Sequence, residues 1–364
     1  MGERTVSFVF LGQPLPRYAI SSLQLAVRYS GVSVRLIASG KLQGRISRVV
    51  DDFVALEDFY DPVEFREAAK RVSFPSAFRN GFWLKTLERL FVLEQFMGAK
   101  SLRAIFHAEL DQLLFKANIL LQSLEMQSER GLFVPFHNPN SAIASVFYSN
   151  SQAAIRSLLD SIHDGPSFPN EMTVIARWAA ENPTLMYALP TIATIANKST
   201  EPTPHGVGQV SINDIHGVVD AAQLGQWVAG DDPRNISIRE VPRTKFVSHY
   251  IKGPLTRDQL SQMRFSWVRQ DRSLRVRLGD SDETQVFNLH IHSKIHKWLN
   301  ASDDHLDKMI ELSNEKEVVA LPGTRKTQIL YRNANFVREV LRSPGKAIGK
   351  VISIRDPRRS RRRL

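Results

Sequence analysis

The chain of 364 residues is 43% hydrophobic and 23% charged, which is enough apolar material for one large core or two modest ones. It contains no cysteine, which excludes disulfides, zinc thiolate sites and thiol nucleophiles and fits a reducing compartment. The apolar run near the N-terminus is too short for a signal peptide, and no run reaches the ~20 residues that a membrane helix needs. We therefore expect a soluble, cytoplasmic protein.

The net charge of +11 is concentrated at the C-terminus. Residues 338–364 contain ten Lys or Arg against Glu339 and Asp356, a local charge of +8 that leaves +3 for the rest. This basic tail has three interpretations. It is a solvated end, it binds the anionic inner face of a membrane with an attraction of ~1 kcal/mol per basic residue, or it binds a nucleic acid. Apolar residues in 336–341 predict an amphipathic helix before it, which favours a membrane surface over a nucleic acid as partner.

The first forty residues predict a β-α-β unit. Residues 6–11 form an apolar run typical of a buried strand, residues 18–29 have the periodicity of an amphipathic helix, and residues 32–38 form a second strand. Such a unit favours a mostly parallel sheet. Ligands of these sheets bind beyond the carboxyl ends of the strands, so we expect Leu11 and Gly12 beside a ligand.

Two acids follow a second apolar segment. Residues 82–97 predict a helix with Lys85, Glu88 and Arg89 on the polar side away from the core, and residues 103–106 predict the strand that leads to Glu109 and Asp111. Side chains two apart in a strand share a face, so both acids can face one crevice and hold a divalent cation that carries a diphosphate. The alternative is a half-exposed strand end with two solvated acids.

The middle of the chain predicts mainly helices and loops. Residues 133–148 are expected to be a loop followed by a strand, and residues 152–162 and 171–180 to be helices. Residues 197–209 are rich in Ser, Thr, Pro and Gly and predict a loop, either a lid over a ligand or a plain surface connection.

A later strand carries histidines. In residues 286–296, His290 and His292 alternate with apolar residues and therefore point to one face, which Lys294 continues. Imidazoles suit a metal and a lysine suits a phosphate, while a purely structural role is the alternative. Before it, a short helix predicted within residues 219–235 carries several polar side chains, the first of which is an Asp that typically caps a helix.

With these features in this order, the chain resembles the GT-A glycosyltransferases over about residues 5–300. The resemblance rests on the N-terminal β-α-β unit, the helix with Arg89, the acid-x-acid motif Glu109-Leu110-Asp111, the segment from Asp220 to Gln226, and the run from His292 to Lys294. It implies an α/β fold with a mostly parallel, Rossmann-like sheet flanked by helices. The implied catalytic domain is residues 1–300, followed by a helical, basic extension in residues 301–364.

The resemblance also implies a site. The acid-x-acid motif would hold Mn2+ or Mg2+ on the diphosphate of a nucleoside-diphosphate sugar. The implied metal ligands are Asp111 and His292, with Glu109 at the metal, the ribose or a bound water. The implied phosphate and nucleotide contacts are Lys294, Arg89, Leu11 and Gly12, and the implied contacts to the sugar or acceptor are Asp220, Gln223 and Gln226.

This chain departs from the pattern of the glycogenin-like and lipooligosaccharide galactosyltransferases in two places. Its motif begins with Glu instead of Asp, and its His-x-His-Ser-Lys run differs from the His-x-x-Gly-x-x-Lys-Pro-Trp of the glycogenin relatives. Both His290 and His292 therefore remain candidate ligands, with His292 preferred. If the enzyme inverts configuration it needs a carboxylate base, for which Asp220 and Asp231 are candidates.

The expected function is transfer of a sugar to a glycan or lipid-linked acceptor, as in bacterial surface-polysaccharide synthesis, by an enzyme peripheral to the inner membrane face. One alternative is a nucleotidyltransferase acting on sugar phosphates, although residues 11–17 poorly match the Gly-rich, basic loop that such enzymes carry after the first strand. The other is a nucleic-acid-binding protein that uses the tail. We expect no nucleic-acid partner, because the rest of the sequence has no basic stretch interleaved with aromatics.

Overall fold

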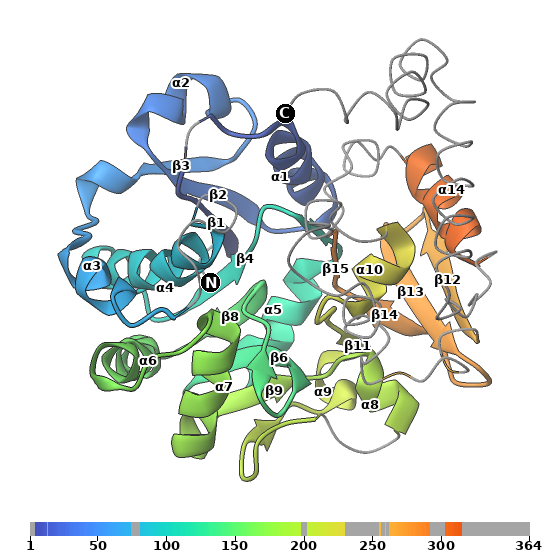
Figure 1. The fold of residues 1–364 in the computed structure, drawn as a ribbon. Helices are drawn as coiled ribbons and strands as arrows, with labels where there is room; N and C mark the ends of the chain where they lie inside the picture. Colours follow the sequence, from blue (N-terminus) through green and yellow to red (C-terminus); the bar gives the residue numbers. More distant parts are fainter. Residues whose placement is uncertain are drawn as a thin grey trace, which may run out of the picture.

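The computed structural model describes residues 4–12, 14–73, 81–197, 202–229, 255, 259, 262–291 and 303–314. A nine-stranded sheet lies at its centre, with the order β10-β9-β6-β8-β4-β1-β2-β3 and with β7 pairing to β6 (Figure 1). Its strands are β1 (Thr5–Phe10), β2 (Ser33–Ala38), β3 (Asp52–Ala55), β4 (Ile105–Ala108), β6 (Leu132–Asn138), β7 (Ser141–Ala142), β8 (Val146–Ser149), β9 (Met186–Leu189) and β10 (Gly208–Gln209).

The helices around this sheet are mostly amphipathic. They are α1 (Arg17–Tyr29), α2 (Gln43–Ile46), α3 (Val63–Ala69), α4 (Phe82–Ala99), α5 (Ala117–Glu125), α6 (Gln152–Asp164), α7 (Glu171–Glu181), α8 (Ile192–Asn197) and α9 (Ile212–Ile215). The predicted helices near residues 18–29, 82–97, 152–162 and 171–180 are confirmed. Their apolar stripes determine which face of the sheet each one covers.

The N-terminal β-α-β unit is confirmed. Strands β1 and β2 pair in parallel from Thr5 with Ser33 to Phe10 with Ala38, and β4 pairs in parallel along the other edge of β1. All the pairings in the large sheet are parallel except those that β8 makes with β4 and β6 and the short β6–β7 pair. The chain therefore has the predicted α/β fold with a mostly parallel sheet.

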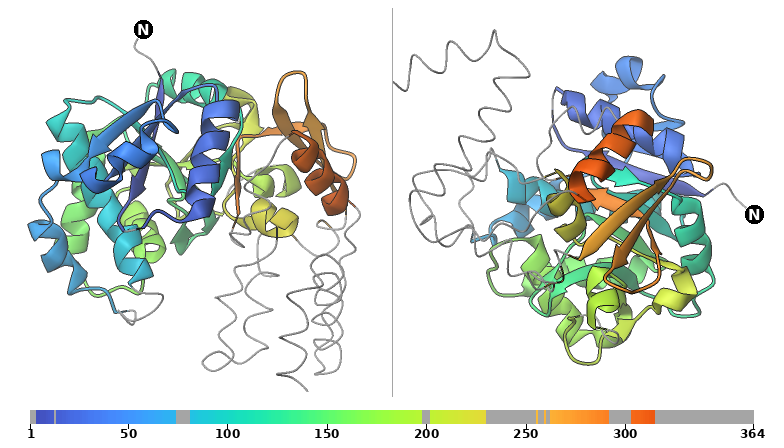
Figure 2. Two further views of the ribbon diagram at one scale, coloured as in Figure 1. Left: turned by 90° about the horizontal axis from the view of Figure 1, so that it is seen from above. Right: turned by 90° about the vertical axis from the view of Figure 1, so that its right-hand side faces the viewer.

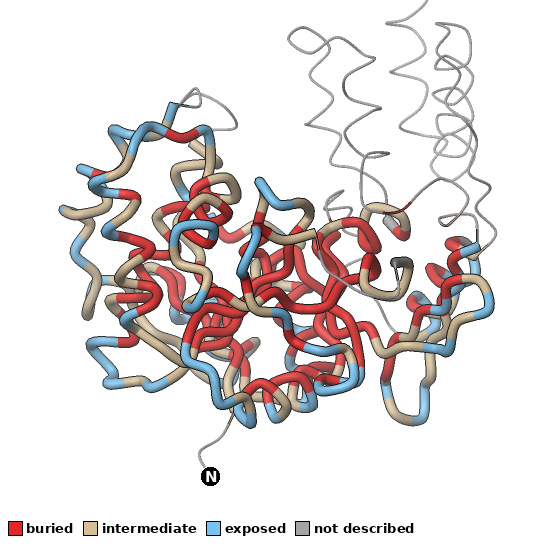
Figure 3. Tube along the Cα trace, turned by 90° about the horizontal axis from the view of Figure 1, so that it is seen from below, coloured by how far each residue is buried: buried red, intermediate tan, exposed pale blue. Residues whose placement is uncertain are grey.

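Two apolar clusters cover the two faces of this sheet. Because neighbouring side chains in a strand point to opposite faces, Phe8 packs with α1 and α5, whereas Val9 packs with α4, α6 and α7. Most of the large apolar side chains are buried, and the burial is continuous through the centre of the molecule (Figure 3). The double covering leaves the ends of the strands as the place where polar side chains can meet.

A smaller unit packs beside this sheet (Figure 2). It contains a four-stranded sheet with the order β11-β14-β13-β12 and a two-stranded pair of β15 with β5. Its elements are β5 (Gln112–Leu114), β11 (Gly217–Val218), β12 (Met263–Val268), β13 (Ser273–Leu278), β14 (Thr284–Val286), β15 (Asn288–His290), α10 (Gln223–Ala229) and α14 (Asp303–Asn314). Helix α14 buries Leu306, Met309 and Ile310 in the apolar cluster of this unit, so residues 303–314 pack with it.

One prediction about secondary structure was wrong. Residues 133–148 were expected to begin as a loop, but they contain β6, the short β7 and β8. The aromatic side chains of Phe133 and Phe136 are buried, and this burial outweighs the turn signal of Pro135. Among the described residues, no helix is long and apolar enough to cross a membrane. The basic tail, residues 338–364, lies outside the described residues.

Candidate active site

Glu109 and Asp111 lie on a tight turn between β4 and β5. Strand β4 ends at Ala108, the backbone N–H of Gln112 donates to the carbonyl of Glu109 at 3.1 Å, and the N–H of Glu109 donates to the carbonyl of Ser145 at 2.7 Å. The prediction that both acids project from one face of a strand was therefore wrong in its geometry. The turn, at the carboxyl end of β4, is what brings the two carboxylates to the same place.

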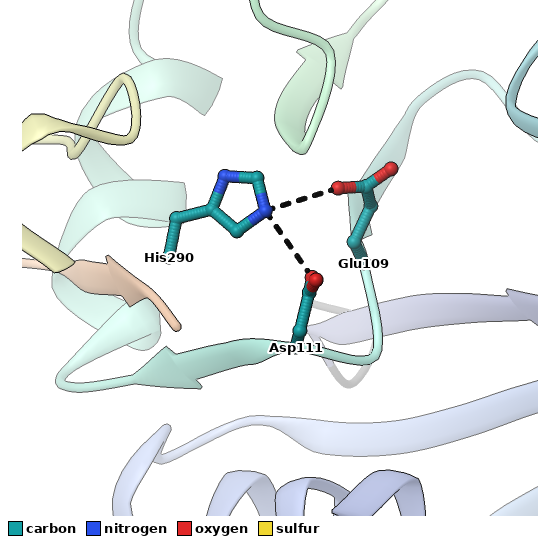
Figure 4. A group of neighbouring side chains, drawn as sticks. All are labelled: Glu109, Asp111 and His290. Carbon is teal, nitrogen blue, oxygen red and sulfur yellow. Dashed lines mark ion pairs between the residues drawn. The ribbon is translucent and has the colours of Figure 1, made fainter. Parts of the chain in front are cut away.

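A histidine from a distant segment completes the cluster. Strand β15 pairs antiparallel with β5, and the N–H of Ile291 donates to the carbonyl of Asp111 at 2.8 Å. The Nε2 atom of His290 lies 3.3 Å from Oδ1 of Asp111 and 3.5 Å from Oε2 of Glu109 (Figure 4). The three candidate ligand atoms all lie within 4.8 Å of one another.

The electrostatics of this cluster favour a positive charge. Burial disfavours a charged imidazole, but Asp111 and then Glu109 outweigh it and raise the pKa of His290 above its usual value. Two carboxylate oxygens and one imidazole nitrogen form a donor set that suits a divalent cation such as Mn2+. The residues present therefore fit a metal. His292, which the sequence prediction preferred as the metal ligand, and the phosphate candidate Lys294 lie outside the described residues.

Asp220 supports the histidine strand and is not among the described residues that line the cavity discussed below. It is 1% exposed, its Oδ1 accepts from the N–H of Leu224 at 2.8 Å, and its Oδ2 accepts from the N–H of Gly225 at 2.7 Å and of His290 at 2.9 Å. Burial raises the pKa of Asp220, while these N–H groups oppose the rise. The expected contact of Asp220 with sugar or acceptor is corrected to a capping role.

The two glutamines of the same helix also lie elsewhere. Gln226 is half-buried on α10, and neither Gln226 nor the buried Gln223 is among the described residues that line the cavity discussed below. Helix α10 instead packs its N-terminal turn directly on β15. A Cβ atom added at Gly225 would lie 2.1 Å from the carbonyl oxygen of His290, so only glycine permits this approach.

A buried amide pair fixes the register of β15 against β5. The Nδ2 of Asn288 donates to Oε1 of Gln112 at 2.7 Å, and the N–H of Asp220 donates to Oδ1 of Asn288 at 2.9 Å. The hydroxyl of Ser22 on α1 donates to the carbonyl of Gln112 at 2.7 Å. This network ties the histidine strand to the acid turn and to α1. The amide side chain at the first residue of each of these two short strands was the sequence signal for it.

The cluster lies in the lining of a cavity of about 390 Å³. The carboxyl end of β1 contributes Leu11 and Gly12, helix α4 contributes Arg89, and the start of α7 contributes Glu171. Leu11, Gly12 and Arg89 thus share a cavity with the acid pair. Of the expected nucleotide and metal contacts, only His292 and Lys294 lie outside the described residues.

Arg89 is an interior residue. It is 5% exposed, its Nη1 pairs with Oε1 of Glu109, and its Nη2 donates to the carbonyl of Ala144 at 3.3 Å. Arg89 lies on the polar side of its helix as expected, but that side faces the acid turn and not the solvent. Its partner is Glu109, whereas its helix neighbour Glu88 accepts from the hydroxyl of Tyr60 at 3.2 Å.

Lys85 is a cation at this cavity that the sequence analysis assigned to solvent. It is exposed, lies one turn before Arg89 on α4, and lines the cavity. The ammonium group of Lys85 lies close to Gly12 at the end of β1. A Cβ atom added at Gly12 would lie 3.8 Å from Nζ of Lys85 and 3.3 Å from the ring of Phe10. Within the described part of the chain, Lys85 forms no ion pair.

Glu171 is a second residue that the sequence analysis missed. It is the first residue of α7, whose cap is Asn170, and its side chain is buried in the cavity lining. Burial raises the pKa of Glu171 to about 7, Arg89 opposes the rise, and Glu109 adds to it. An Asn-Glu pair at the start of a predicted helix usually indicates only a cap, so no sequence signal distinguished it.

Comparisons with known proteins give only distant structural likenesses. No family model matches the chain, and no curated protein matches it. The apo form of mouse xyloside xylosyltransferase 1 is similar with a TM-score of 0.35 and 9% identity, covering 52% of this chain and 85% of that one. The glycosyltransferase PaToxG is similar with a TM-score of 0.33 and 9% identity, covering 50% and 69%. A cytidylyltransferase from Leptospira borgpetersenii is similar with a TM-score of 0.29 and 13% identity, covering 49% and 70%.

Proposed function

We propose that the protein is a metal-dependent glycosyltransferase that uses a nucleoside-diphosphate sugar. The observation that carries this proposal is the convergence of Glu109, Asp111 and His290 in the lining of one cavity at the carboxyl ends of β1 and β4. This is where open parallel sheets bind nucleotides. A three-ligand site leaves coordination positions for phosphate oxygens, which is how Mg2+ and Mn2+ are commonly held with nucleotides.

The charges of the site suit a departing diphosphate. Bound Mn2+ or Mg2+ would supply a Lewis acid that stabilises the negative charge on the diphosphate. Arg89 pairs with Oε1 of Glu109, which leaves Oε2 of Glu109 directed toward His290. Lys85, one turn away on the same helix, supplies an ammonium group at the cavity, and Glu88 is a described carboxylate that acts on it electrostatically. We assign Lys85 the phosphate-neutralising role that the sequence analysis gave to Lys294.

The remaining lining suits a nucleoside. Leu11 and Gly12 follow β1, and the aromatic side chains of Tyr18, Phe82 and Trp83 line the same cavity. Aromatic rings can stack on a base or a ribose, and glycine lets a ligand approach the backbone closely. A nucleoside bound here would place its diphosphate toward Lys85 and the acids.

The test of this function begins with binding. Thermal unfolding is followed with UDP, GDP or CMP, each with and without Mn2+, because a ligand at 100 times its Kd stabilises by about 2.7 kcal/mol. We expect a metal-dependent rise in Tm with one nucleoside diphosphate and hydrolysis of the matching nucleotide sugar. Release of pyrophosphate from a nucleoside triphosphate and a sugar phosphate would instead identify a nucleotidyltransferase. No metal-dependent shift with any nucleotide would contradict both.

The acceptor proposal rests on the sequence. We propose a glycan or lipid-linked acceptor, reached when the basic tail binds an anionic membrane surface. Co-sedimentation with anionic and neutral liposomes, at low and physiological salt, compares the full chain with a chain that ends at Pro344. Binding by the full chain alone, and only to anionic lipid, is the expected result. Equal binding by both chains would remove the tail from the mechanism.

A further inference from the structure

The cavity contains an acid that the proposed binding of a metal and a diphosphate does not use. Glu171 is 5% exposed, lines the cavity, and has an Oε2 atom without a hydrogen-bond partner among the described residues. A buried carboxylate oxygen without a donor is costly. Such a group in a cavity is typical of a residue whose partner is a substrate.

The place of Glu171 in the fold is fixed independently of the metal cluster. Its helix begins at Asn170, whose side-chain oxygen accepts from the N–H of Thr173 at 3.1 Å, so the first turn of α7 is held in place. Thr86 on α4, whose hydroxyl donates to the carbonyl of Trp83 at 3.0 Å, lies near the Glu171 carboxyl, and Arg89 and Glu109 are the charged groups that act on it. Glu171 therefore lies in the same cavity as the acid turn, reached from a different element.

The other carboxylates of the site have their partners. Glu109 pairs with Arg89 and His290, Asp111 pairs with His290, and Asp220 accepts three backbone N–H groups. Among the described residues that line the cavity, Glu171 is the remaining acid. Glu171 is therefore the carboxylate that is available to stabilise the part of the substrate on which positive charge develops.

We propose that Glu171 is a catalytic residue whose carboxylate faces the sugar carbon from which the diphosphate departs and stabilises the positive charge that develops there. This inference rests on the proposed function. The bond between that carbon and the phosphate oxygen breaks, and its electron pair leaves with the diphosphate. The acceptor oxygen then bonds to the carbon, and its proton passes to the diphosphate. Glu171 acts on this step by charge alone.

The surroundings of Glu171 are consistent with this role. Burial raises the pKa of Glu171 to about 7, so at neutral pH the carboxyl is divided between its two forms. The nearby guanidinium of Arg89 favours the anion, and a cationic sugar carbon would favour it further. An acid held neutral by burial until positive charge appears beside it interacts more strongly with the transition state than with the ground state.

The first test compares Glu171→Gln with Glu181→Gln, which changes an exposed glutamate at the other end of the same helix. Cleavage of UDP-glucose, UDP-galactose, UDP-xylose, UDP-N-acetylglucosamine and GDP-mannose is measured with Mn2+, and calorimetry gives the Kd of the matching nucleoside diphosphate. We expect Glu171→Gln to lower kcat about a hundredfold or more while the Kd changes less than about twofold. Glu181→Gln should behave as the parent.

The second test uses Glu171→Ala with sodium azide. An azide ion fits the space left by the carboxylate, so it should restore donor cleavage and yield a glycosyl azide if the carboxylate faces the reacting carbon. A slow Glu171→Ala that azide does not rescue would overturn the inference. So would parent-like cleavage by Glu171→Gln.

The two proposals fail in different ways. A parent protein that binds and cleaves a nucleotide sugar, with a Glu171→Gln variant that does the same, leaves the proposed function intact and removes only the role of Glu171. A parent that shows no metal-dependent nucleotide binding and cleaves none of the five donors removes both. A Tm of the Gln variant that equals or exceeds that of the parent in the absence of ligand establishes that any loss of activity is not a loss of folding.

Discussion

The two sides of the metal cluster are built in different ways. Glu109 and Asp111 come from one short turn, whose backbone bonds to Gln112 and Ser145 hold it at the end of the central sheet. His290 comes from the smaller unit and reaches the acids only because β15 pairs with β5. The acid side is local in sequence, whereas the histidine side depends on contacts between segments far apart in the chain.

This difference distinguishes residues that would bind the ligand from residues that hold the site in place. Under the proposed function, the residues of the acid side contact the ligand directly, so changing them should affect binding while the fold stays intact. The histidine side is held by a buried network of Asp220, Asn288 and Gln112, so changes there should affect stability and binding together. Four predictions test this distinction.

The largest expected effect is on the acid side. Asp111→Asn removes a carboxylate from the metal cluster and should abolish metal-dependent nucleotide binding without a loss of stability, because the amide keeps the shape of the side chain. Calorimetry with the nucleoside diphosphate that stabilises the parent, with and without Mn2+, measures it. Asp214→Asn, on the exposed side of α9, is the control. Equal metal-dependent affinity in the variant and the parent would sink this assignment.

Asp220→Ala should be the most destabilising of the four changes. Three buried N–H groups lose their acceptor, and each unsatisfied group costs about 1–3 kcal/mol, so we expect a loss of about 3 kcal/mol or more. Urea unfolding measures the free energy, with Asp214→Ala as control. Metal-dependent nucleotide binding should weaken as well, since the backbone of His290 loses its anchor. A stable variant with weakened chemistry would mean that Asp220 faces substrate after all.

Glu171 should make stability depend on pH. Burial raises its pKa from 4.5 to about 7, so between these values the folded protein binds a proton that the unfolded chain has released. This contribution is fully present below pH 4.5 and is lost as the pH rises to 7, at up to about 1.4 kcal/mol per pH unit. The metal-free parent should therefore lose stability relative to Glu171→Gln across this range.

Unfolding by urea at a series of pH values measures this difference. Glu181→Gln removes an exposed carboxyl from the same helix and should run parallel to the parent. Parallel curves for the parent and Glu171→Gln would mean that the carboxyl is as well solvated as in the unfolded chain, and that the burial has no energetic consequence.

The smallest effect is expected at Lys85. Lys85→Gln removes a solvent-exposed cation from the cavity and should lower kcat/KM for the nucleotide sugar about tenfold, because an exposed charge is partly screened. Stability should not change. Lys100→Gln, at the far end of the same helix and also exposed, is the matched control. A variant with the parent's kcat/KM would leave the phosphates to groups outside the described residues.

Most of the central fold was predictable because it is local. The apolar runs of β1 and β2, the amphipathic pattern of α1 and the length of α4 are each contained in fewer than about 20 consecutive residues. The right-handed β-α-β rule then makes the sheet parallel. The strand order beyond β4, where β8 runs antiparallel, follows from no such local signal.

The candidate site was predictable only in part. The spacing of Glu109 and Asp111 and their place after a strand indicated an acid pair beside Leu11 and Gly12, and the four residues share one cavity. Strand alternation places His290 and His292 on one face and cannot choose between them. The pairing of β15 with β5 puts His290 at the acids, and that register depends on Asn288 and Gln112 in separate segments.

The residues that the sequence analysis missed share one cause. Lys85 and Arg89 were assigned to the outer side of a helix because they are charged, and Glu171 was read as part of a helix start. Each faces the cavity because of how α4 and α7 pack around the acid turn. Periodicity identifies the apolar face of a helix, but a functional cavity is lined with polar residues and looks like a solvent face in sequence.

The pairing of β5 with β15 also bears on how the protein folds. Gln112 and Asn288 are 176 residues apart, and closing a loop of that length costs about 4–5 kcal/mol of chain entropy before any contact rewards it. The pairings of the central sheet close shorter loops, the longest being the one between Val6 of β1 and Phe106 of β4, so we expect this sheet to form before β15 docks. The histidine would then join the acids late in folding, and an ion that binds all three ligands would slow the reopening of the smaller unit.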